Sequence, residues 1–247
     1  MANPQNLTGH RARYDFLRKK LPPDKVGFAY VGGGDKIDPA LVGFIEEELI
    51  RRHHALDDAH VVDLGCGVGR LTRYLVDSPV RSYLGIDIIP EILADAEKVG
   101  VARPTFRFAL TDSCSIPEQD GKADIICGFS LITHLLDEET FVYFQESARV
   151  LKRGGTAVFS FLDFSHPRHQ SQFTKYAASY KSQRDLLKFF EKSTLGTFAK
   201  LVDLEVIDML DAGQSFLTSG ARATMLNGDV APRSTSNGQS TLYMRKP

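Results

Sequence analysis

Residues 61–70 read Val61-Val62-Asp63-Leu64-Gly65-Cys66-Gly67-Val68-Gly69-Arg70. An apolar run ends here in glycines at alternate positions, and residues 70–76 follow with helical spacing. Glycine permits a sharp backbone turn and lets the chain approach a bound molecule without interference from a Cβ atom. The stretch therefore predicts a buried strand, a ligand-binding glycine loop and the start of a helix.

A glycine loop after a strand also occurs in dinucleotide-binding proteins, whose pattern is G-x-G-x-x-G. That pattern requires glycine or alanine where this chain has Arg70. Asp63 would also bring a carboxylate close to a pyrophosphate, which it would repel, whereas it would attract a cation. A dinucleotide-dependent oxidoreductase stays open as an alternative, but the loop favours a ligand with a cationic part.

The pattern D-x-G-x-G-x-G from Asp63 to Gly69 resembles the first motif of the class I S-adenosylmethionine-dependent methyltransferases. The resemblance covers about residues 58–163. It includes residues 149–155, R-V-L-K-R-G-G, which are similar to the family's R-V-L-K-P-G-G element with Arg153 in place of proline. The resemblance implies a Rossmann-like α/β fold with helices on both faces of a seven-stranded, mostly parallel sheet, in the order 3-2-1-4-5-7-6 with strand 7 antiparallel.

Acids follow the next two predicted strands. Asp87 ends the apolar run 82–88, where nucleotide-binding α/β folds place an acid that accepts hydrogen bonds from ribose hydroxyls. An N-cap for the helix that begins near Pro90 is a compatible alternative. Asp112 and Ser113 follow the alternating run 104–109, and the resemblance implies that they meet the adenine ring. A turn-forming Asp-Ser pair is the alternative there.

The resemblance thus implies a site for S-adenosyl-L-methionine, the methyl donor, in which Asp63 acts directly or through water. Tyr30 is expected to close over the donor, and no metal site is expected. The expected donor-binding residues are Asp63, Gly65, Cys66, Gly67, Asp87, Ile88, Asp112, Ser113, Phe129 and Tyr30.

His134 is the candidate catalytic residue. It follows the predicted fourth strand, 123–129, at the end of the sheet where the ligand site is expected. Histidine titrates near neutral pH, so it can serve as a general base for an acceptor hydroxyl. A packing or loop-anchoring role is the alternative.

The segments outside the motif region divide the chain. Residues 1–57 are predicted to form an N-terminal helical lid or cap, with a helix at 10–21 stopped by Pro22-Pro23, a glycine-rich loop at 30–35 and a helix at 38–53. A plain linker is the alternative for the glycine-rich loop. Residues 58–247 form the predicted methyltransferase domain, with a basic helical insertion at about 164–200 and a loop at about 213–238. The insertion is either a solvated face or a wall of the acceptor pocket.

Length and charge limit the possible partners. The 247 residues carry a net charge of -1, which gives no support for nucleic-acid binding. No apolar run approaches the roughly 20 residues of a membrane span, and the first residues lack signal-peptide features, so a cytoplasmic protein is expected. Cys66, Cys114 and Cys127 are expected to be free thiols.

The acceptor is the least defined part of the prediction. The segments around residues 32–35 and 129–135 look similar to those of bacterial small-molecule or glycan methyltransferases, which favours oxygen on a small or sugar-like acceptor. The Asn-Pro-Pro-Tyr type motif of exocyclic-amine DNA methylation is absent after the fourth strand. A protein acceptor, and a non-catalytic protein that binds the donor or a partner, stay open as alternatives.

Overall fold

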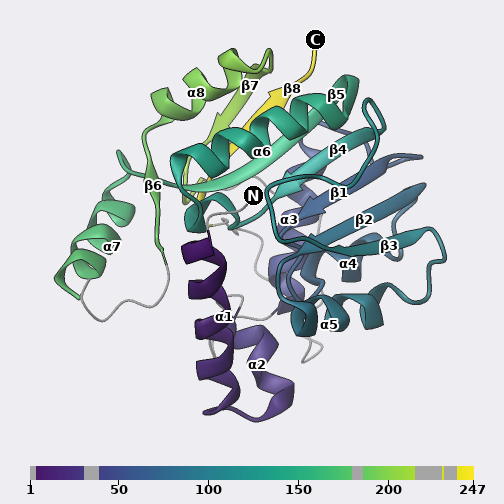
Figure 1. Ribbon diagram of the computed structural model, residues 1–247. Helices are drawn as coiled ribbons and strands as arrows, with labels where there is room; N and C mark the ends of the chain where they lie inside the picture. The colour runs from purple at the N-terminus through teal and green to yellow at the C-terminus, as the bar shows by residue number, and fades with distance from the viewer. Residues whose placement is uncertain (1–3, 31–38, 180–185, 215–229, 231–237) are drawn as a thin grey trace.

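One sheet organises the chain (Figure 1). The computed structural model describes residues 4–30, 39–179, 186–214, 230 and 238–247. The strand order is β3-β2-β1-β4-β5-β8-β7, and β8 runs antiparallel to both of its neighbours while the other pairs along this path are parallel. This confirms the predicted fold class and order. The strands are β1 (His60–Leu64), β2 (Ser82–Asp87), β3 (Phe106–Leu110), β4 (Ala123–Gly128), β5 (Leu151–Asp163), β7 (Glu205–Leu210) and β8 (Ser240–Arg245).

The region after β5 contains one strand that the sequence did not predict. β6 (Phe189–Phe190) pairs with Leu162 and Asp163 at the carboxyl end of β5. The helix α7 (Pro167–Ala178) precedes β6, and α8 (Lys192–Leu201) follows it. Leu195 and Ala199 of α8 are fully buried in the core, so α8 belongs to the helical layer over the sheet and α7 is the projecting part of the insertion (Figure 1).

Helices cover both faces of the sheet. α6 (Asp137–Val150) and α8 pack on the face that carries Val62 and Leu64, whereas α3 (Pro39–Arg51) and α4 (Arg70–Leu75) pack on the face that carries Val61. α5 (Pro90–Gly100) lies beside α4 against β2 and β3. All five residues of β1 are buried, as expected for a central parallel strand covered on both faces. Because side chains alternate along a strand, Asp63 points to the same face as Val61, and its side chain therefore lies in the core beneath α3 and α4.

The start of α6 is held to neighbouring segments by polar contacts. Leu136 occupies the N-cap position. The Leu136 N–H donates to the carboxylate of Glu139, one turn into the helix, at 2.8 Å. Asp137 is the first helical residue and pairs with Lys188 at 2.9 Å. The acid at the helix start thus binds the segment that leads into β6.

The N-terminal segment forms two helices, α1 (Pro4–Arg18) and α2 (Pro23–Tyr30), which lie together beside α5 (Figure 1). The sequence predicted one helix at 10–21 and missed α2. Pro23 was interpreted only as a stop, yet it is the first residue of α2, where the missing N–H of proline costs no helical hydrogen bond. Residues 31–35 of the predicted glycine-rich loop and the first residue of the predicted helix 38–53 lie outside the described residues, as does most of the predicted loop 213–238.

The predicted boundary at residue 57 stays a prediction. α3, on its N-terminal side, packs in the same layer as α4 and contributes Leu49 and Ile50 to the core. Among the helices of the described residues, none is both long enough and apolar enough to cross a membrane.

Candidate functional site

The glycine loop leads from β1 into α4 and lies against the carboxyl end of β2. Gly65, Gly67 and Gly69 have φ angles of 69°, 57° and 78°, in the left-handed region that other residues rarely adopt. The N–H groups of Gly65 and Cys66 donate to the Ile86 carbonyl at 2.8 and 3.0 Å. A Cβ atom on Gly65 would also lie 3.2 Å from the Leu131 side chain. Backbone conformation and close packing therefore both select glycine here.

Asp87 holds this loop against the end of β2. Its carboxylate accepts hydrogen bonds from the N–H groups of Gly67, Ile88 and Ile89 at 3.0, 2.7 and 3.0 Å. Ile89, not Asp87, is the N-cap of α5, so the capping alternative is wrong. Burial raises the pKa of Asp87, and the three N–H donors oppose that rise. An ionised carboxylate has about four acceptor sites, so it keeps capacity for a ligand hydroxyl.

Asp63 is engaged inside the protein. Its side chain is 3% exposed, accepts a hydrogen bond from the Tyr83 hydroxyl at 2.8 Å and lies 3.6 Å from the Cys127 sulfur. Burial raises its pKa to about 6. Beneath it, Glu46 of α3 pairs with Arg70 at 2.9 Å, and burial raises the pKa of Glu46 to about 7 against the opposing charge of Arg70. The role of Asp63 toward a donor stays a prediction.

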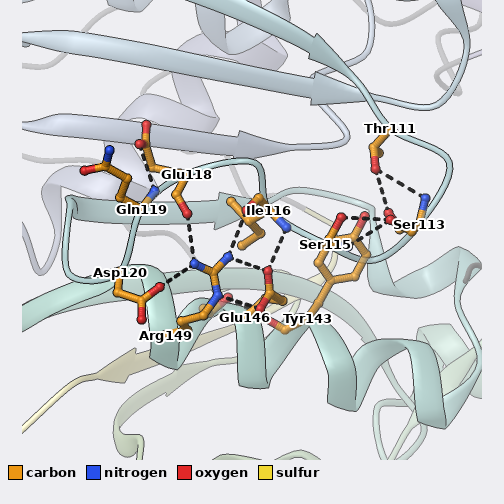
Figure 2. A network of polar contacts seen from close by, with 11 residues as sticks. Thr111, Ser113, Ser115, Ile116, Glu118, Gln119, Asp120, Tyr143, Glu146 and Arg149 are labelled. Carbon is orange, nitrogen blue, oxygen red and sulfur yellow. Dashed lines mark hydrogen bonds and ion pairs between the residues drawn. The ribbon is translucent and has the colours of Figure 1, made fainter.

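The loop after β3 carries the next two predicted site residues. Asp112 is exposed and Ser113 is half-buried. The Ser113 N–H donates to the Thr111 hydroxyl at 3.2 Å, and the Ser113 hydroxyl lies 2.8 Å from that of Ser115 (Figure 2). The residues between β3 and β4 form no helix, so side chains must hold this loop in place.

Arg149 of α6 supplies that support, and the sequence analysis missed it (Figure 2). Its guanidinium donates to the carbonyls of Ile116 and Glu118, both at 2.9 Å, and pairs with Glu146 and Asp120 at 2.6 Å. The carboxylate of Glu146 in turn accepts the Ile116 N–H at 2.9 Å. Arg149 stood in the R-V-L-K-R-G-G motif, and its function there is to fix the loop that follows β3.

Three further candidates, Cys66, Phe129 and Ile88, pack against neighbouring apolar side chains. Cys66 packs against Leu93 and Ala96 of α5, and burial raises the pKa of its thiol well above the usual value. Phe129 is 6% exposed and belongs to the core on the α3 and α4 side. Ile88 is half-buried against the cluster formed with α1 and α2. A contact of these three residues with a donor stays a prediction, and it would be made by their backbone or by apolar surface.

Ser130, immediately after β4, has a strained backbone that the sequence did not reveal. Its φ is 59°, which is uncommon for a residue with a side chain. A closed ring of hydrogen bonds holds it: the Ser130 N–H donates to Ser160, the Ser160 hydroxyl to Gln239, and the Gln239 amide to the Ser130 hydroxyl, at 2.7, 2.7 and 3.0 Å. The ends of β4 and β5 and the start of β8 thus meet in one polar cluster.

His134 ends the short 3-10 helix η1 (Ile132–His134) that follows this cluster. Its Nδ1 lies 2.8 Å from the Leu186 carbonyl, which can only accept, so Nδ1 carries the proton. In the neutral ring Nε2 then holds the lone pair. His134 therefore anchors the segment before β6 through Nδ1, as the alternative held.

Two neighbouring residues of α1 reach both sides of the site. The His10 ring meets the His134 ring edge-on at 5.6 Å, and His10 Nδ1 lies 2.9 Å from the Tyr30 hydroxyl. Arg11 pairs with Glu91, at the start of α5, through contacts of 2.8 and 2.9 Å. α1 therefore links the element after β4 to the element after β2. The lid role of this segment and of Tyr30 stays a prediction.

Among the described side chains, no group of three or more histidines, cysteines and acids is placed to hold a metal ion. Cys66, Cys114 and Cys127 are free thiols.

Comparison with known proteins identifies the domain. Residues 62–159 match the family described as methyltransferase domain. Over 98 residues the chain is 31% identical to 2-methyl-6-phytyl-1,4-hydroquinone methyltransferase of Synechocystis. The matched region covers 40% of this chain and 30% of that enzyme. It is 28% identical over 184 residues to ubiquinone biosynthesis O-methyltransferase of Methylococcus capsulatus, covering 69% of this chain and 73% of the relative.

Solved structures share the whole fold. The magnesium protoporphyrin IX methyltransferase of Synechocystis, solved with bound SAH, superposes with a TM-score of 0.62 at 14% identity, over 96% of this chain and 98% of that one. A SAM-dependent methyltransferase from Methanosarcina mazei gives a TM-score of 0.56 at 16% identity, over 80% and 96%. The resemblance to the class I methyltransferases is therefore confirmed, in the sequence over residues 62–159 and in the fold over most of the chain.

Proposed function

We propose that this chain, which carries a methyltransferase domain of the class I fold, binds S-adenosyl-L-methionine and transfers its methyl group to oxygen on a small-molecule or sugar-like acceptor. Bound S-adenosylmethionine supplies an already activated methyl group on a sulfonium. The protein then needs to align the acceptor with that methyl group, exclude water and take up a proton.

The arrangement around Asp87 is the observation that carries this proposal. The carboxylate is 8% exposed and is fixed by three N–H donors, one of them from the glycine loop. A fixed acceptor at the end of the second strand suits the two hydroxyls of a ribose. The left-handed glycine loop beside it supports an assignment of the methionine part to this loop, and the position of Asp112 and Ser113 after β3 supports an assignment of the adenine to them.

The acceptor side of the proposal rests on His134. With Nδ1 protonated and held by the Leu186 carbonyl, the ring is oriented and its basic nitrogen is Nε2. A base of this kind suits removal of a proton from a hydroxyl. The names of related enzymes include both O- and N-methyltransferases, so the relatives alone do not select oxygen.

Isothermal titration calorimetry on the full chain tests donor binding. S-adenosylmethionine and S-adenosylhomocysteine should bind, and NADH should not. Asp87→Asn keeps the shape of the side chain but turns one acceptor into a donor, which opposes either the Gly67 N–H or a ribose hydroxyl. We expect it to weaken donor binding by about tenfold or more. Donor binding that is absent, or that is unchanged in this variant, would overturn the proposal.

A methyl-transfer assay against a panel of hydroxylated small molecules tests turnover and separates an enzyme from a donor-binding protein. In the variant His134→Gln the amide can still donate to the Leu186 carbonyl but cannot act as a base. On a true acceptor we expect kcat to fall by roughly a hundredfold while donor affinity is kept. Normal turnover in His134→Gln would remove His134 from the mechanism.

A further inference from the structure

A polar cavity lies at the edge of the sheet opposite to the glycine loop, where the strands begin. It has a volume of about 370 Å³, within the usual range for small-ligand sites. Its lining comes from the starts of β1, β2, β3 and β5 and from the loop before β4. The lining residues are His60, Arg81, Ser82, Arg107, Glu118, Lys122 and Lys152.

Cationic side chains outnumber the acids around this cavity by one charge. Four cationic side chains line it, and Glu118 is the one acid among the lining residues. Asp124, just behind the wall, is a second acid, and Asp58, which is 82% exposed, is a third at the rim beside Arg81. Even with all three acids counted, the cations are in excess. Such an excess attracts an anion.

Acids in the wall hold the cations in position. Asp124 pairs with Arg81 at 2.9 Å and with Lys152 at 2.8 Å, and one of its oxygens also accepts the His60 N–H at 2.7 Å. Glu118 pairs with Arg107 at 2.5 Å. These carboxylates restrain the guanidinium and ammonium groups, so the cavity keeps its donors without a ligand. Less conformational entropy is then lost on binding.

The floor of the cavity is a buried histidine whose ring is also fixed. The His60 side chain is 6% exposed, with Nε2 at 3.1 Å from Glu118 and Nδ1 at 2.8 Å from the Ser82 hydroxyl. Lys122 at the mouth is exposed, and within the described part of the chain no carboxylate pairs with its ammonium. The cavity thus presents two guanidinium groups and two ammonium groups to one ligand.

We propose that this cavity binds a small phosphorylated ligand, separate from the methyl-donor site at the other end of the strands. A phosphate group has several oxygens and up to two negative charges, which match guanidinium forks combined with lysine point charges better than a single carboxylate does. The overall charge of -1 and the small volume of the cavity favour a small ligand over a nucleic acid.

Titration of the full chain with inorganic pyrophosphate, followed by calorimetry, tests this proposal. We expect saturable binding that weakens as NaCl is raised from about 50 to about 300 mM, because the lining cations are partly exposed. The double variant Arg107→Ala/Lys122→Ala should weaken binding by about tenfold or more. The matched control Lys175→Ala/Lys200→Ala removes two positive charges from exposed positions on α7 and α8 and should leave pyrophosphate binding unchanged.

Three results would overturn the proposal. These are no saturable binding of pyrophosphate, an equal loss in the control pair, or a duplex oligonucleotide that displaces pyrophosphate at lower concentration. S-adenosylmethionine binding by Arg107→Ala/Lys122→Ala serves as the folding control, and we expect it to match the wild type. Loss of pyrophosphate binding with normal S-adenosylmethionine binding therefore reports on this cavity alone, and loss of S-adenosylmethionine binding reports on the proposed donor site.

Discussion

The two ends of the same strands are built from different kinds of polar group. At the carboxyl ends of β1 and β2, backbone N–H groups converge on the Asp87 carboxylate and glycines take left-handed conformations. At the amino ends, long cationic side chains are held by Glu118 and Asp124. Backbone donors are fixed by the fold and insensitive to single substitutions, whereas side-chain charges can be removed one at a time and are screened by salt.

The pKa values of the acids at the two ends are also shifted in opposite directions. Burial raises the pKa of Glu46 and Asp63 beneath the glycine loop. At the amino ends burial acts in the same sense on Glu118 and Asp124, but hydrogen bonds and cations outweigh it and lower the pKa of both. The folded protein therefore disfavours the ionised form of the acids at the carboxyl end. It favours the ionised form of the acids at the amino end.

The largest effect is expected where α3 supports the glycine loop from below. A Cβ atom at Gly43 would lie 2.2 Å from the Arg70 carbonyl oxygen, so Gly43→Ala must displace α3 from α4. We expect the free energy of unfolding in urea to fall by more than about 3 kcal/mol.

Gly196→Ala is the matched control for this substitution, since nothing lies within 4 Å of the added atom in α8. It should stabilise the protein by up to about 1 kcal/mol, because alanine favours the helix over glycine. Equal stability of Gly43→Ala and the wild type would show that the close contact between α3 and α4 is not required.

The pH dependence of stability should separate the two ends. A carboxyl whose folded pKa is raised adds stability that is complete below its unfolded pKa and is lost as pH rises through its folded pKa. For Glu46 this window runs from 4.5 to about 7. The free energy of unfolding of the wild type should therefore fall across this window relative to Glu46→Gln, by up to about 3 kcal/mol.

Asp124→Asn should alter the acid side of the same curve. A carboxyl with a lowered folded pKa adds stability that is present above its unfolded pKa, here 3.8, and is lost as pH falls through its folded pKa. This variant should lose less stability than the wild type on acidification. Identical curves for both variants across the whole pH range would contradict the contrast between the two ends.

Removal of Arg149 should affect the loop after β3 more than the rest of the fold. Arg149→Ala leaves the Ile116 and Glu118 carbonyls without their charged donor, which should cost about 2 kcal/mol of unfolding free energy. Amide hydrogen exchange should rise in residues 111–120. Arg153→Ala, an exposed arginine four residues on, should stay within about 0.5 kcal/mol of the wild type. Unchanged exchange in the loop of Arg149→Ala would refute this role.

The smallest effect is expected for the ion pair between α1 and α5. Arg11 and Glu91 have side chains 40% and 38% exposed, and exposed pairs contribute under about 1 kcal/mol. Arg11→Ala should increase the dissociation rate of S-adenosylhomocysteine by a few fold in stopped-flow measurements, and high salt should have the same effect on the wild type. Arg18→Ala, at the exposed end of α1, is the control. A rate equal to that of the wild type would separate α1 from ligand release.

The sequence predicted the elements whose patterns are periodic and missed those set by tertiary contacts. Strand order and strand ends followed from apolar runs and the resemblance, so Asp87 and the glycine loop could be placed in advance. α2 was missed because its eight residues include Gly27, which the close approach of Val68 requires. No local signal in the sequence shows that packing.

The predicted site was incomplete for a similar reason. The left-handed φ of Ser130 depends on Ser160 and Gln239, which come from distant parts of the chain. The sequence did not predict that strand alternation turns the Asp63 side chain into the core, where the Tyr83 hydroxyl donates to it. The sequence showed that Asp63 points to the face opposite to that of Val62 and Leu64. It did not show that α3 and α4 cover this face and bury the position.

The attachment of residues 186–188 to η1 makes the region around α7 an exchangeable module. The Leu186 carbonyl accepts from His134 and the Lys188 N–H donates to the Thr133 carbonyl at 2.7 Å, while at the other end Ser165 and His169 bind Asp163. Both ends of the module are thus attached to the edge of the sheet at fixed points. A segment of different length and composition between these two attachments is therefore expected to leave the position of His134 unchanged.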